Sequence, residues 1–343
     1  MKVAVVGATG MVGQMMLKVL EERAFPVSEL IPVASSHSVG KEVTFRGESH
    51  KVVSMEEGVA AHPDIALFSA GGSVSKEWAP AFASTGCVVI DNSSAWRMEK
   101  NIPLVVPEVN SDILTSEDKI IANPNCSTIQ LVVALHPIHQ QFGIRRIIVS
   151  TYQAVSGTGM KAVQQYYEEA RGEEEVHRVY HYPIYANVIP HCDVFLDNDY
   201  TKEEMKLVHE TRKIMRVPDM PVTATAVRVP VIAGHSESIN IELSKDTDAH
   251  TIRNILEQAP GIKVYDDPAD HKYPMPGLAD GRDAVWVGRI RKDESSDRCW
   301  NLFVVADNLR KGAATNAVQI AELLIEKGIL KAEKQSDIAV SEQ

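Results

Sequence analysis

The sequence lacks the features that would suit it to nucleic acid or to a membrane. Its 35 Lys and Arg residues are outnumbered by 46 Asp and Glu residues, the net charge is −11, and no basic stripe runs along the chain. Because a nucleic-acid-binding surface normally carries such a stripe, we expect no nucleic-acid partner. No apolar run approaches the roughly 20 residues that span a bilayer, so we expect no membrane partner either.

Cysteine is also scarce. The chain has four cysteines, which lie far apart, and none belongs to a CxxC pair. This pattern fits neither a disulfide framework nor a zinc ribbon, so we predict reduced thiols and no bound metal. The run His191-Cys192-Asp193 could suggest a metal site, but it lacks the separated ligands that close a tetrahedral shell.

The start of the chain leaves no room for a signal peptide, because a strand is predicted from the second residue. We therefore expect a cytoplasmic protein that acts on small molecules. Its 343 residues are too many for one ordinary core and predict two domains.

The first part of the chain alternates short strands with helix-like segments. Residues 2–6 form a β-branched run that stops at a glycine-rich turn and continues as a helical pattern to about Arg23. Further short apolar runs follow at 30–34, 65–69, 88–90, 104–106 and 120–122. Such alternation predicts an α/β domain with a mostly parallel sheet.

The pattern changes after Ile147. Longer strand candidates lie at 147–154, 223–230, 238–243, 284–291 and 300–306, with helices predicted near 159–171, 202–216 and 249–259. This arrangement predicts an α+β second domain. An amphipathic stretch at 313–327 predicts a C-terminal helix that returns to the first domain, and the polar tail at 331–343 is expected to be disordered.

A glycine motif predicts the cofactor. In Gly7-Ala8-Thr9-Gly10-Met11-Val12-Gly13, the first glycine permits a tight turn, the second lets phosphate oxygens approach the backbone, and the third lets helix and strand pack closely. Because the motif directly follows an N-terminal strand, it predicts a dinucleotide at the helix N-terminus. The residues expected to hold it are Gly7, Thr9, Gly10, Met11, Val12 and Gly13. A merely structural glycine turn is the alternative.

The second strand discriminates between NAD and NADP. It ends in Ala34-Ser35-Ser36-His37-Ser38, with no acidic residue in place to bind a ribose 2′-hydroxyl. The hydroxyls of Ser35, Ser36 and Ser38, together with the histidine, could instead bind a 2′-phosphate. NADP is therefore favoured, and an ordinary serine-rich turn is the alternative.

Cys126 is the candidate nucleophile. It lies in Asn123-Pro124-Asn125-Cys126-Ser127-Thr128, where a proline-punctuated turn runs into the apolar stretch 128–142. The thiol is expected on the first turn of a helix, where free backbone N–H groups and the helix dipole favour the thiolate. The alternative is that Cys126 is a small buried hydrophobic residue, as many free cysteines are.

Six segments together resemble a known family. They are Gly7-Ala8-Thr9-Gly10-Met11-Val12-Gly13, Ser69-Ala70-Gly71-Gly72, Asp91-Asn92-Ser93-Ser94-Ala95-Trp96-Arg97-Met98, Val106-Pro107-Glu108-Val109-Asn110, Asn123-Pro124-Asn125-Cys126-Ser127-Thr128 and Gly234-His235-Ser236-Glu237-Ser238. With these motifs the chain resembles the aspartate-semialdehyde dehydrogenases, of the bacterial branch closest to the Gram-positive enzymes, over nearly its whole length.

The resemblance implies an activity and an assembly. The reaction is the NADPH-dependent conversion of aspartyl 4-phosphate into aspartate 4-semialdehyde and phosphate through a cysteine thioester. It lies on the route to diaminopimelate, lysine, methionine and threonine. The implied assembly is a homodimer, with a tetramer as the alternative.

The family's catalytic groups correspond to three residues of this sequence. Cys126 matches the nucleophile, and His235, in a Gly-His-Ser turn between strands, matches the general acid/base. Gln153, at the end of a predicted strand, matches the glutamine that orients the thiol or the substrate. Considered alone, His235 would be a structural histidine and Gln153 an ordinary strand-end amide.

The resemblance also implies ligands for the substrate. Arg228 matches the ligand of the substrate carboxylate and Arg97 the phosphate-binding arginine, since a guanidinium binds either group through two hydrogen bonds. Glu203 and Lys206 lie three residues apart on one face of a predicted helix, where they could hold the substrate ammonium and phosphate. An exposed ion pair is the alternative for them. Asn125 is the remaining expected substrate ligand.

Other positions match the surroundings of the cofactor. Ser156, Gly157 and Asn308 correspond to residues near the nicotinamide, and Gly71 and Gly72 to a loop that lines the cofactor. The resemblance also implies two domains. Residues 1–125, completed by 313–330, would form an NADP-binding Rossmann-type domain, and residues 126–312 a catalytic and dimerisation domain.

Two other functions compete with this one. N-acetyl-glutamyl-phosphate reductase shares the fold and the thioester chemistry, but its sequence around the cysteine differs. A non-catalytic NADP-binding paralogue is the second rival, and it would not require Cys126, Gln153, Arg228 and His235 as a set. His37 is a departure from the family pattern, because its nearest members often carry an arginine there.

Overall fold

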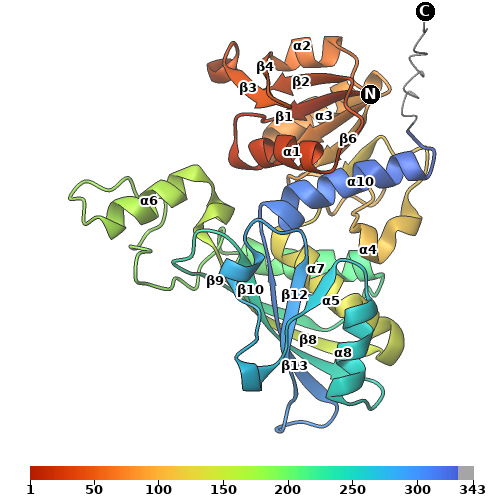
Figure 1. The fold of residues 1–343 in the computed structure, drawn as a ribbon, viewed down its shortest axis with the longest axis vertical. Helices are drawn as coiled ribbons and strands as arrows, with labels where there is room; N and C mark the ends of the chain where they lie inside the picture. The colour runs from red at the N-terminus through yellow and green to blue at the C-terminus, as the bar shows by residue number, and fades with distance from the viewer. Residues whose placement is uncertain (331–343) are drawn as a thin grey trace, which may run out of the picture.

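The computed structural model describes residues 1–330 and contains two large sheets, one above the other in Figure 1, and a two-stranded hairpin. The predicted tail at 331–343 lies outside the described residues. The first sheet is parallel throughout, as predicted, and its strands follow the order β2 (Glu29–Val33), β1 (Lys2–Val6), β5 (Ile65–Phe68), β6 (Val88–Asp91) and β7 (Ile120–Ala122).

One predicted strand is absent from the ladder of the first sheet. Residues 104–106 are buried, but they join the sheet only through an isolated bridge between Leu104 and Ala122. Pro103 and Pro107 flank the segment, and proline cannot donate a hydrogen bond to a ladder. The run therefore contributes to the core without becoming a strand.

The order of the first sheet reverses between β1 and β5, and ligands of open α/β sheets bind at such switch points. The turn after β1 lies directly against the end of β5. A Cβ at Gly7, where φ is +83°, would come 2.6 Å from the carbonyl oxygen of Ser69, and a Cβ at Gly13 would come 2.1 Å from the carbonyl oxygen of Gly7. Only glycine fits at either position.

Helices cover both faces of the first sheet. Their bounds are α1 (Met11–Glu22), α2 (Met55–Ala60), α3 (Gly72–Ser84) and α10 (Thr315–Glu326). Ala317, Ile320 and Leu324 of α10 belong to one core cluster with the side chains of β1 and α1. The C-terminal helix therefore returns to the first sheet, as predicted. The hairpin of β3 (Glu42–Phe45) and β4 (Glu48–Lys51) was not predicted, because its strands are short and polar.

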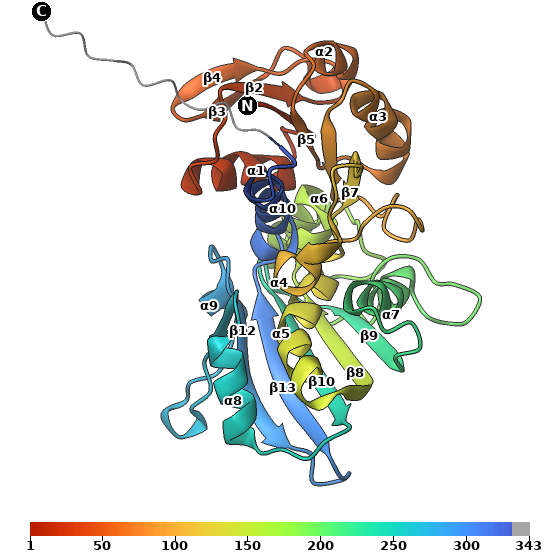
Figure 2. The ribbon, with the colours of Figure 1, turned by 90° about the vertical axis from the view of Figure 1, so that its right-hand side faces the viewer.

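The second sheet is mixed and has six strands. Their order is β11 (Ile262–Val264), β12 (Val285–Lys292), β13 (Cys299–Ala306), β10 (His235–Leu243), β8 (Ile144–Gln153) and β9 (Val222–Arg228). One face forms a core with α5 (Cys126–Phe142), α7 (Lys202–Met215) and α8 (Ala249–Gln258), as Figure 2 shows. On the other face Ser150, Tyr152 and Phe303 remain partly or fully exposed.

The helix α5 passes from the first sheet to the second. Eleven of its 17 residues are buried, which is typical of a helix enclosed on most sides. Asn125 caps its N-terminus and Gly143, with φ of 68°, ends it. Cys126 is therefore its first residue, which confirms the predicted position of the thiol on a first helical turn.

An arm projects beside the second sheet. It contains α6 (Met160–Ala170) and the irregular segment 171–200 (Figure 1). Most of the exposed large hydrophobic side chains of the described residues lie on this arm, among them Met160, Tyr167, Tyr182, Tyr185 and Phe195. The short helices α4 (Pro107–Asn110) and α9 (Pro276–Ala279) complete the fold. Within residues 1–330, no helix is long and apolar enough to cross a membrane.

Candidate active site

A cavity of about 520 Å³ opens where the turns of the first sheet meet the strand ends of the second. Half of the 22 predicted site residues line it: Val12, Arg97, Asn125, Cys126, Gln153, Ser156, Gly157, Glu203, Lys206, Arg228 and Asn308. They come from segments up to 296 positions apart, since Val12 follows β1 and Asn308 follows β13. His235 is not part of the lining and is fully buried behind it.

Cys126 is partly exposed to this cavity, but its surroundings do not favour the thiolate. The side chain of Asn125 accepts hydrogen bonds from the backbone N–H groups of Ser127 and Thr128 at 3.0 and 3.2 Å, so these helix N–H groups are not free. Burial, followed by the negative charge of Glu203, raises the pKa of Cys126 to about 12. The expectation that the helix start favours the thiolate is therefore wrong, because burial and the charge of Glu203 raise the pKa of Cys126 instead.

Glu203 organises the polar side of the cavity. Its Oε1 accepts hydrogen bonds from Asn125 at 2.8 Å and Gln153 at 3.2 Å, and its Oε2 accepts one from Lys206 at 2.9 Å. Burial alone would raise the pKa of Glu203, but the charge of Lys206 and these hydrogen bonds lower it to about 2. The ion pair of Glu203 and Lys206 exists, and it is partly buried and faces the cavity instead of being exposed.

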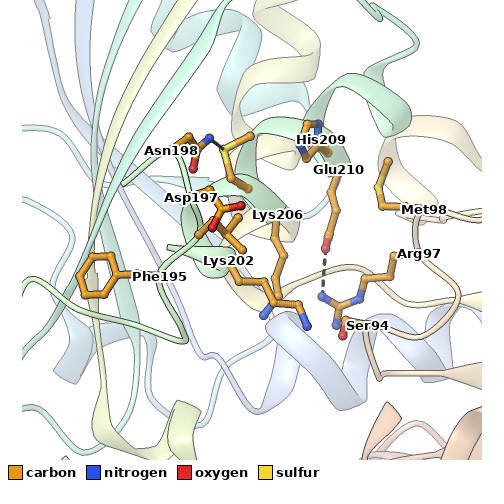
Figure 3. Close-up of a pocket in the computed structure, with 12 residues that line it drawn as sticks. Ser94, Arg97, Met98, Phe195, Asp197, Asn198, Lys202, Lys206, His209 and Glu210 are labelled. Atoms are coloured by element: carbon orange, nitrogen blue, oxygen red, sulfur yellow. Dashed lines mark hydrogen bonds and ion pairs between the residues drawn. The ribbon is translucent and has the colours of Figure 1, made fainter. Parts of the chain in front are cut away.

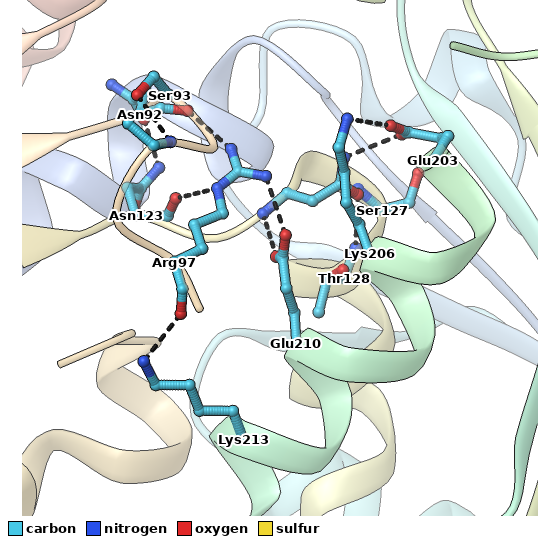
Figure 4. Close-up of polar contacts among 12 residues, drawn as sticks. Asn92, Ser93, Arg97, Asn123, Ser127, Thr128, Glu203, Lys206, Glu210 and Lys213 are labelled. Carbon is cyan, nitrogen blue, oxygen red and sulfur yellow. Dashed lines mark hydrogen bonds and ion pairs between the residues drawn. The ribbon is translucent and has the colours of Figure 1, made fainter. Parts of the chain in front are cut away.

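Arg97 is buried, and its guanidinium already has hydrogen-bond partners within the protein (Figure 4). Its guanidinium donates to the carbonyl oxygens of Asn123 at 3.0 Å and Asn92 at 2.7 Å, and to Oε1 of Glu210 at 3.0 Å. Lys213 donates to the carbonyl oxygen of Arg97 at 2.8 Å and fixes its backbone. A phosphate bound here would share the guanidinium with these partners.

Arg228, Gln153 and His235 lie at neighbouring strand ends. Arg228 and Gln153 are Cα partners at the ends of β9 and β8, and His235 begins β10 beside them. The prediction of a Gly-His-Ser turn is wrong here, because Gly234, with φ of +86°, makes the turn and His235 already pairs with Ala306 of β13. Burial and the charge of Arg228 lower the pKa of His235 to about 3.

The predicted nicotinamide residues support the same strand end. Asn308 donates to the hydroxyl of Ser156 at 3.0 Å and accepts from the backbone N–H of Gly234 at 2.9 Å. Gly157 lies against the ring of His235, since a Cβ there would come 3.0 Å from Nε2. These residues connect the cavity wall to the histidine.

The predicted nucleotide residues meet at the carboxyl ends of β1, β2 and β5. Gly10 is the N-cap of α1 and makes no side-chain cap, so the first N–H groups of the helix can bind an anion. Ser38 ends a short 3₁₀ turn at Ser36–Ser38, with its hydroxyl 3.5 Å from that of Thr9. Ser35 and Ser36 are exposed beside it, and Gly71 and Gly72 begin α3. These positions fit a dinucleotide phosphate with hydroxyls nearby.

A second cavity of about 600 Å³ adjoins the first (Figure 3). The two share Ser94, Arg97 and Lys206. The walls of the second are largely apolar and include Met98 and Phe195. Within residues 1–330, no group of three or more His, Cys, Asp or Glu side chains is arranged to hold a metal ion.

Several residues of the site were not among the predicted ones, and Cys192, Asp193, Glu210 and Gly312 are four of them. Asp193 and Cys192 line the cavity, and Asp193 accepts a hydrogen bond from Lys206 at 2.8 Å. Glu210 could have been found, because it lies four residues after Lys206 on the same helical face. Gly312 belongs to no motif that could have identified it from the sequence. In the structure, a Cβ at Gly312 would come 2.8 Å from the Cβ of Cys126.

Two family models match most of the chain. Residues 2–116 match the model described as "Semialdehyde dehydrogenase, NAD binding domain", and residues 135–311 match "Semialdehyde dehydrogenase, dimerisation domain". The domain boundaries at 125 and 312 stay predictions.

Curated relatives and solved structures carry one name. The aspartate-semialdehyde dehydrogenase of Aquifex aeolicus is 54% identical over 96% of this chain and 99% of its own, and that of Bacillus subtilis is 51% identical over 94% and 96%. The crystal structure of aspartate semialdehyde dehydrogenase II from Vibrio cholerae, complexed with ASA, superposes with a TM-score of 0.91 at 48% identity, covering 95% of this chain and 98% of that one. The chain, with its cysteine-centred cavity between two such domains, belongs to the aspartate-semialdehyde dehydrogenase family.

Proposed function

We propose that this protein catalyses the NADPH-dependent reductive dephosphorylation of aspartyl 4-phosphate to aspartate 4-semialdehyde. The observation that carries the proposal is one cavity in which a helix-start cysteine faces a carboxylate and three cations, Glu203 with Lys206, Arg228 and Arg97. This set complements a substrate that carries an ammonium, a carboxylate and a phosphate.

Cys126 is the nucleophile in the proposed reaction. Its sulfur attacks the carbonyl carbon of the acyl phosphate, the carbonyl oxygen takes up the electron pair, and collapse of this adduct expels phosphate and leaves a thioester. NADPH, when bound, supplies a hydride to the thioester carbonyl carbon. The thiohemiacetal anion then expels the Cys126 sulfur, and the aldehyde leaves.

The remaining residues bind and orient. Arg228 binds the substrate carboxylate, Arg97 and Lys206 the phosphate, and Glu203 the ammonium, with Asn125 holding Glu203 in place at 2.8 Å. Gln153 contacts the hydroxyl of Ser127 at 3.2 Å, next to the nucleophile. These charged side chains bind the charged groups of the substrate and so hold its carbonyl carbon near the sulfur of Cys126.

NADP is the proposed cofactor. The turn at residues 7–13 with its uncapped helix start would hold the pyrophosphate, and Ser38 beside Thr9 would bind the 2′-phosphate. Ser156, Gly157 and Asn308 would line the nicotinamide end of the cavity.

Replacing Cys126 tests the proposed function. The variant Cys126→Ala is expected to lose phosphate-dependent reduction of NADP with the semialdehyde, while NADPH binding measured by fluorescence persists. Cys299→Ala is the matched control, because this thiol is buried in β13 outside the cavity. Unchanged turnover in Cys126→Ala would contradict the proposal, and loss of binding as well would indicate a folding defect.

A homodimer is the proposed assembly. The match to a dimerisation domain supports association, and the arm and the uncovered sheet face present Tyr182, Phe195 and Tyr152 to solvent. Light scattering is expected to give about twice the chain mass of 37.7 kDa. Tyr152→Asp is expected to weaken the dimer, and Val39→Asp, in the turn after β2 of the first sheet, is expected to leave it intact. A mass four times that of the chain would indicate the tetramer.

A further inference from the structure

A row of cations follows one face of α7 at the edge of the reaction cavity. Lys202 and Lys206 lie four residues apart on this helix, and Arg97 contacts its following turn, where Nη1 lies 3.0 Å from Oε1 of Glu210. Figure 3 shows both lysines directed toward the end of the second cavity where Arg97 and Ser94 lie. Two lysines at this spacing repel each other and weaken a helix slightly, so the arrangement favours an anion beside them.

Lys202 differs from the other two cations in its surroundings. Arg97 and Lys206 each have a carboxylate partner at 3.0 Å or less. Lys202 is exposed and belongs to no ion pair within residues 1–330. It lines the second cavity but not the first. Its charge is therefore free to bind a ligand in the second cavity.

The second cavity begins where the proposed phosphate site ends. The two cavities share Ser94, Arg97 and Lys206, and the last two are the proposed phosphate ligands. Ser156 and Asn308, which belong to the proposed nicotinamide end, line the first cavity alone. A phosphate that leaves Arg97 and Lys206 therefore enters the second cavity without passing the nicotinamide.

We propose that Lys202, together with Lys206 and Ser94, forms a second binding site for inorganic phosphate, and that phosphate leaves the reaction cavity through this site while the cofactor remains bound. The inference rests on the proposed function. A lysine ammonium binds such an anion as a compact charge with three donors. In the opposite direction the same site binds phosphate from solvent first, because a cation at the mouth of a cavity raises the local concentration of anions.

The rest of the second cavity suits the passage of phosphate better than its tight binding. The walls are largely apolar, and Met98 and Met205 offer no hydrogen-bond donor to an anion. Glu210 already binds Arg97, and the exposed Asp197 repels a negative charge. Phosphate is therefore held by the cations alone and can leave for solvent.

Initial rates in the phosphorylating direction test the role of Lys202. With semialdehyde, NADP and phosphate varied in turn, we expect Lys202→Gln to raise the KM for phosphate about three- to tenfold and to leave the other two KM values unchanged. The effect should shrink at high salt, which screens charge, and Lys202→Arg should largely restore the KM. Lys263→Gln, at an exposed position of β11 outside both cavities, is the matched control. An unchanged KM for phosphate in Lys202→Gln would overturn the proposal.

A variant that narrows the second cavity tests the route. Met98 is exposed and lines the second cavity alone, so Met98→Trp is expected to fold and to fill part of the path. We expect kcat/KM for phosphate to fall about threefold or more, because association slows, with kcat/KM for the semialdehyde unchanged. Met160→Trp, exposed on α6 outside both cavities, is the control. Identical values in the two variants would overturn the route.

A ³¹P NMR titration of inorganic phosphate with the NADP-bound protein does not depend on turnover. We expect the wild type to bind phosphate about three- to tenfold more tightly than Lys202→Gln, with the unfolding temperatures of both compared. Equal Kd values in two folded proteins would overturn the second phosphate site. Absence of activity in the wild type would instead refute the proposed function, and the titration would still decide whether Lys202 binds phosphate.

Discussion

Nη1 of Arg97 lies 3.0 Å from Oε1 of Glu210, and both side chains are almost completely buried. The other carboxylate oxygen of Glu210 accepts a hydrogen bond of 2.7 Å from the backbone N–H of Asn125. Glu210 therefore joins the proposed phosphate ligand Arg97 to Asn125, the residue that caps the helix beginning with Cys126.

The variant Glu210→Gln tests this connection. Glutamine keeps an oxygen acceptor for Asn125 but leaves the buried charge of Arg97 without its counter-ion, so we expect the free energy of unfolding to fall by about 3 kcal/mol in urea denaturation. Glu117→Gln, in an exposed loop, is the control and should change it by less than about 0.5 kcal/mol. Equal stability of the two variants would show that Arg97 does not depend on Glu210.

Because Gly312 lies against Cys126, the proposed nucleophile, we expect Gly312→Ala to lose activity. The added Cβ would lie 2.8 Å from the Cβ of Cys126, so the thiol must move. A displacement near 1 Å is expected to lower kcat by about 10²-fold, with NADPH affinity unchanged. Gly277→Ala is the matched control, since a Cβ there meets no atom within 4 Å. Wild-type kcat in Gly312→Ala would show that α5 can absorb the contact.

The raised pKa of Cys126 predicts slow alkylation that accelerates with pH. The rate with iodoacetamide should still be rising above pH 9, because the pKa lies at about 12. In Glu203→Gln a negative charge beside the thiol is lost, the pKa falls, and the rate at pH 8 should increase about three- to tenfold. Mass spectrometry of the Cys126 peptide gives the rate, and the exposed Glu257→Gln is the control. A wild-type plateau below pH 8 would contradict the raised pKa.

Replacing His37 with arginine is expected to tighten the binding of NADPH. It is exposed on the turn that carries Ser38, beside Thr9. In His37→Arg a permanent charge with a forked donor is added for a 2′-phosphate, and we expect the Kd for NADPH to fall about three- to tenfold, equivalent to roughly 0.7 to 1.4 kcal/mol. The Kd for NADH, measured in parallel by fluorescence titration, should not change. An equal gain for both cofactors would place the 2′-phosphate elsewhere.

Replacing Lys311 is expected to lower the free energy of unfolding strongly. It is buried, and its Nζ donates to both carboxylate oxygens of Glu108 at 2.8 Å, to Asn316 at 3.0 Å and to Gln319 at 2.7 Å. Lys311→Met leaves a mostly buried carboxylate without its partner, so the free energy of unfolding should fall by about 3 to 5 kcal/mol.

The control for Lys311 is an exposed ion pair. Lys272 contacts Asp270 at 2.9 Å with both side chains largely in solvent, and Lys272→Met should cost less than about 1 kcal/mol. In the double variant Lys311→Met with Glu108→Gln the uncompensated charge is removed, so part of the lost stability should return. No recovery would mean that the loss arises from packing.

The sequence predicted most of the helices and strands and half of the residues that line the cavity. Alternation of apolar runs predicted both sheets, because strand periodicity is a local property. The turn at residues 7–13 could be predicted because only glycine fits its close contacts, and the family motifs located Cys126, Gln153 and Arg228. Residues 104–106 were wrongly predicted as a strand, because the apolar run does not show that the flanking prolines limit its pairing. The hairpin of β3 and β4 was missed, because its strands are short and polar and have no clear strand pattern.

The sequence by itself determined the order of helices and strands, the nucleotide turn and the cysteine at a helix start. The tertiary structure alone decided that burial and Glu203 raise the pKa of this thiol, that Glu210 reaches Asn125 across 85 residues of sequence, and that Gly312 lies against Cys126. The physical reason is that backbone propensity depends on nearby residues, whereas pKa values, ion pairs and close contacts depend on groups that only folding brings together.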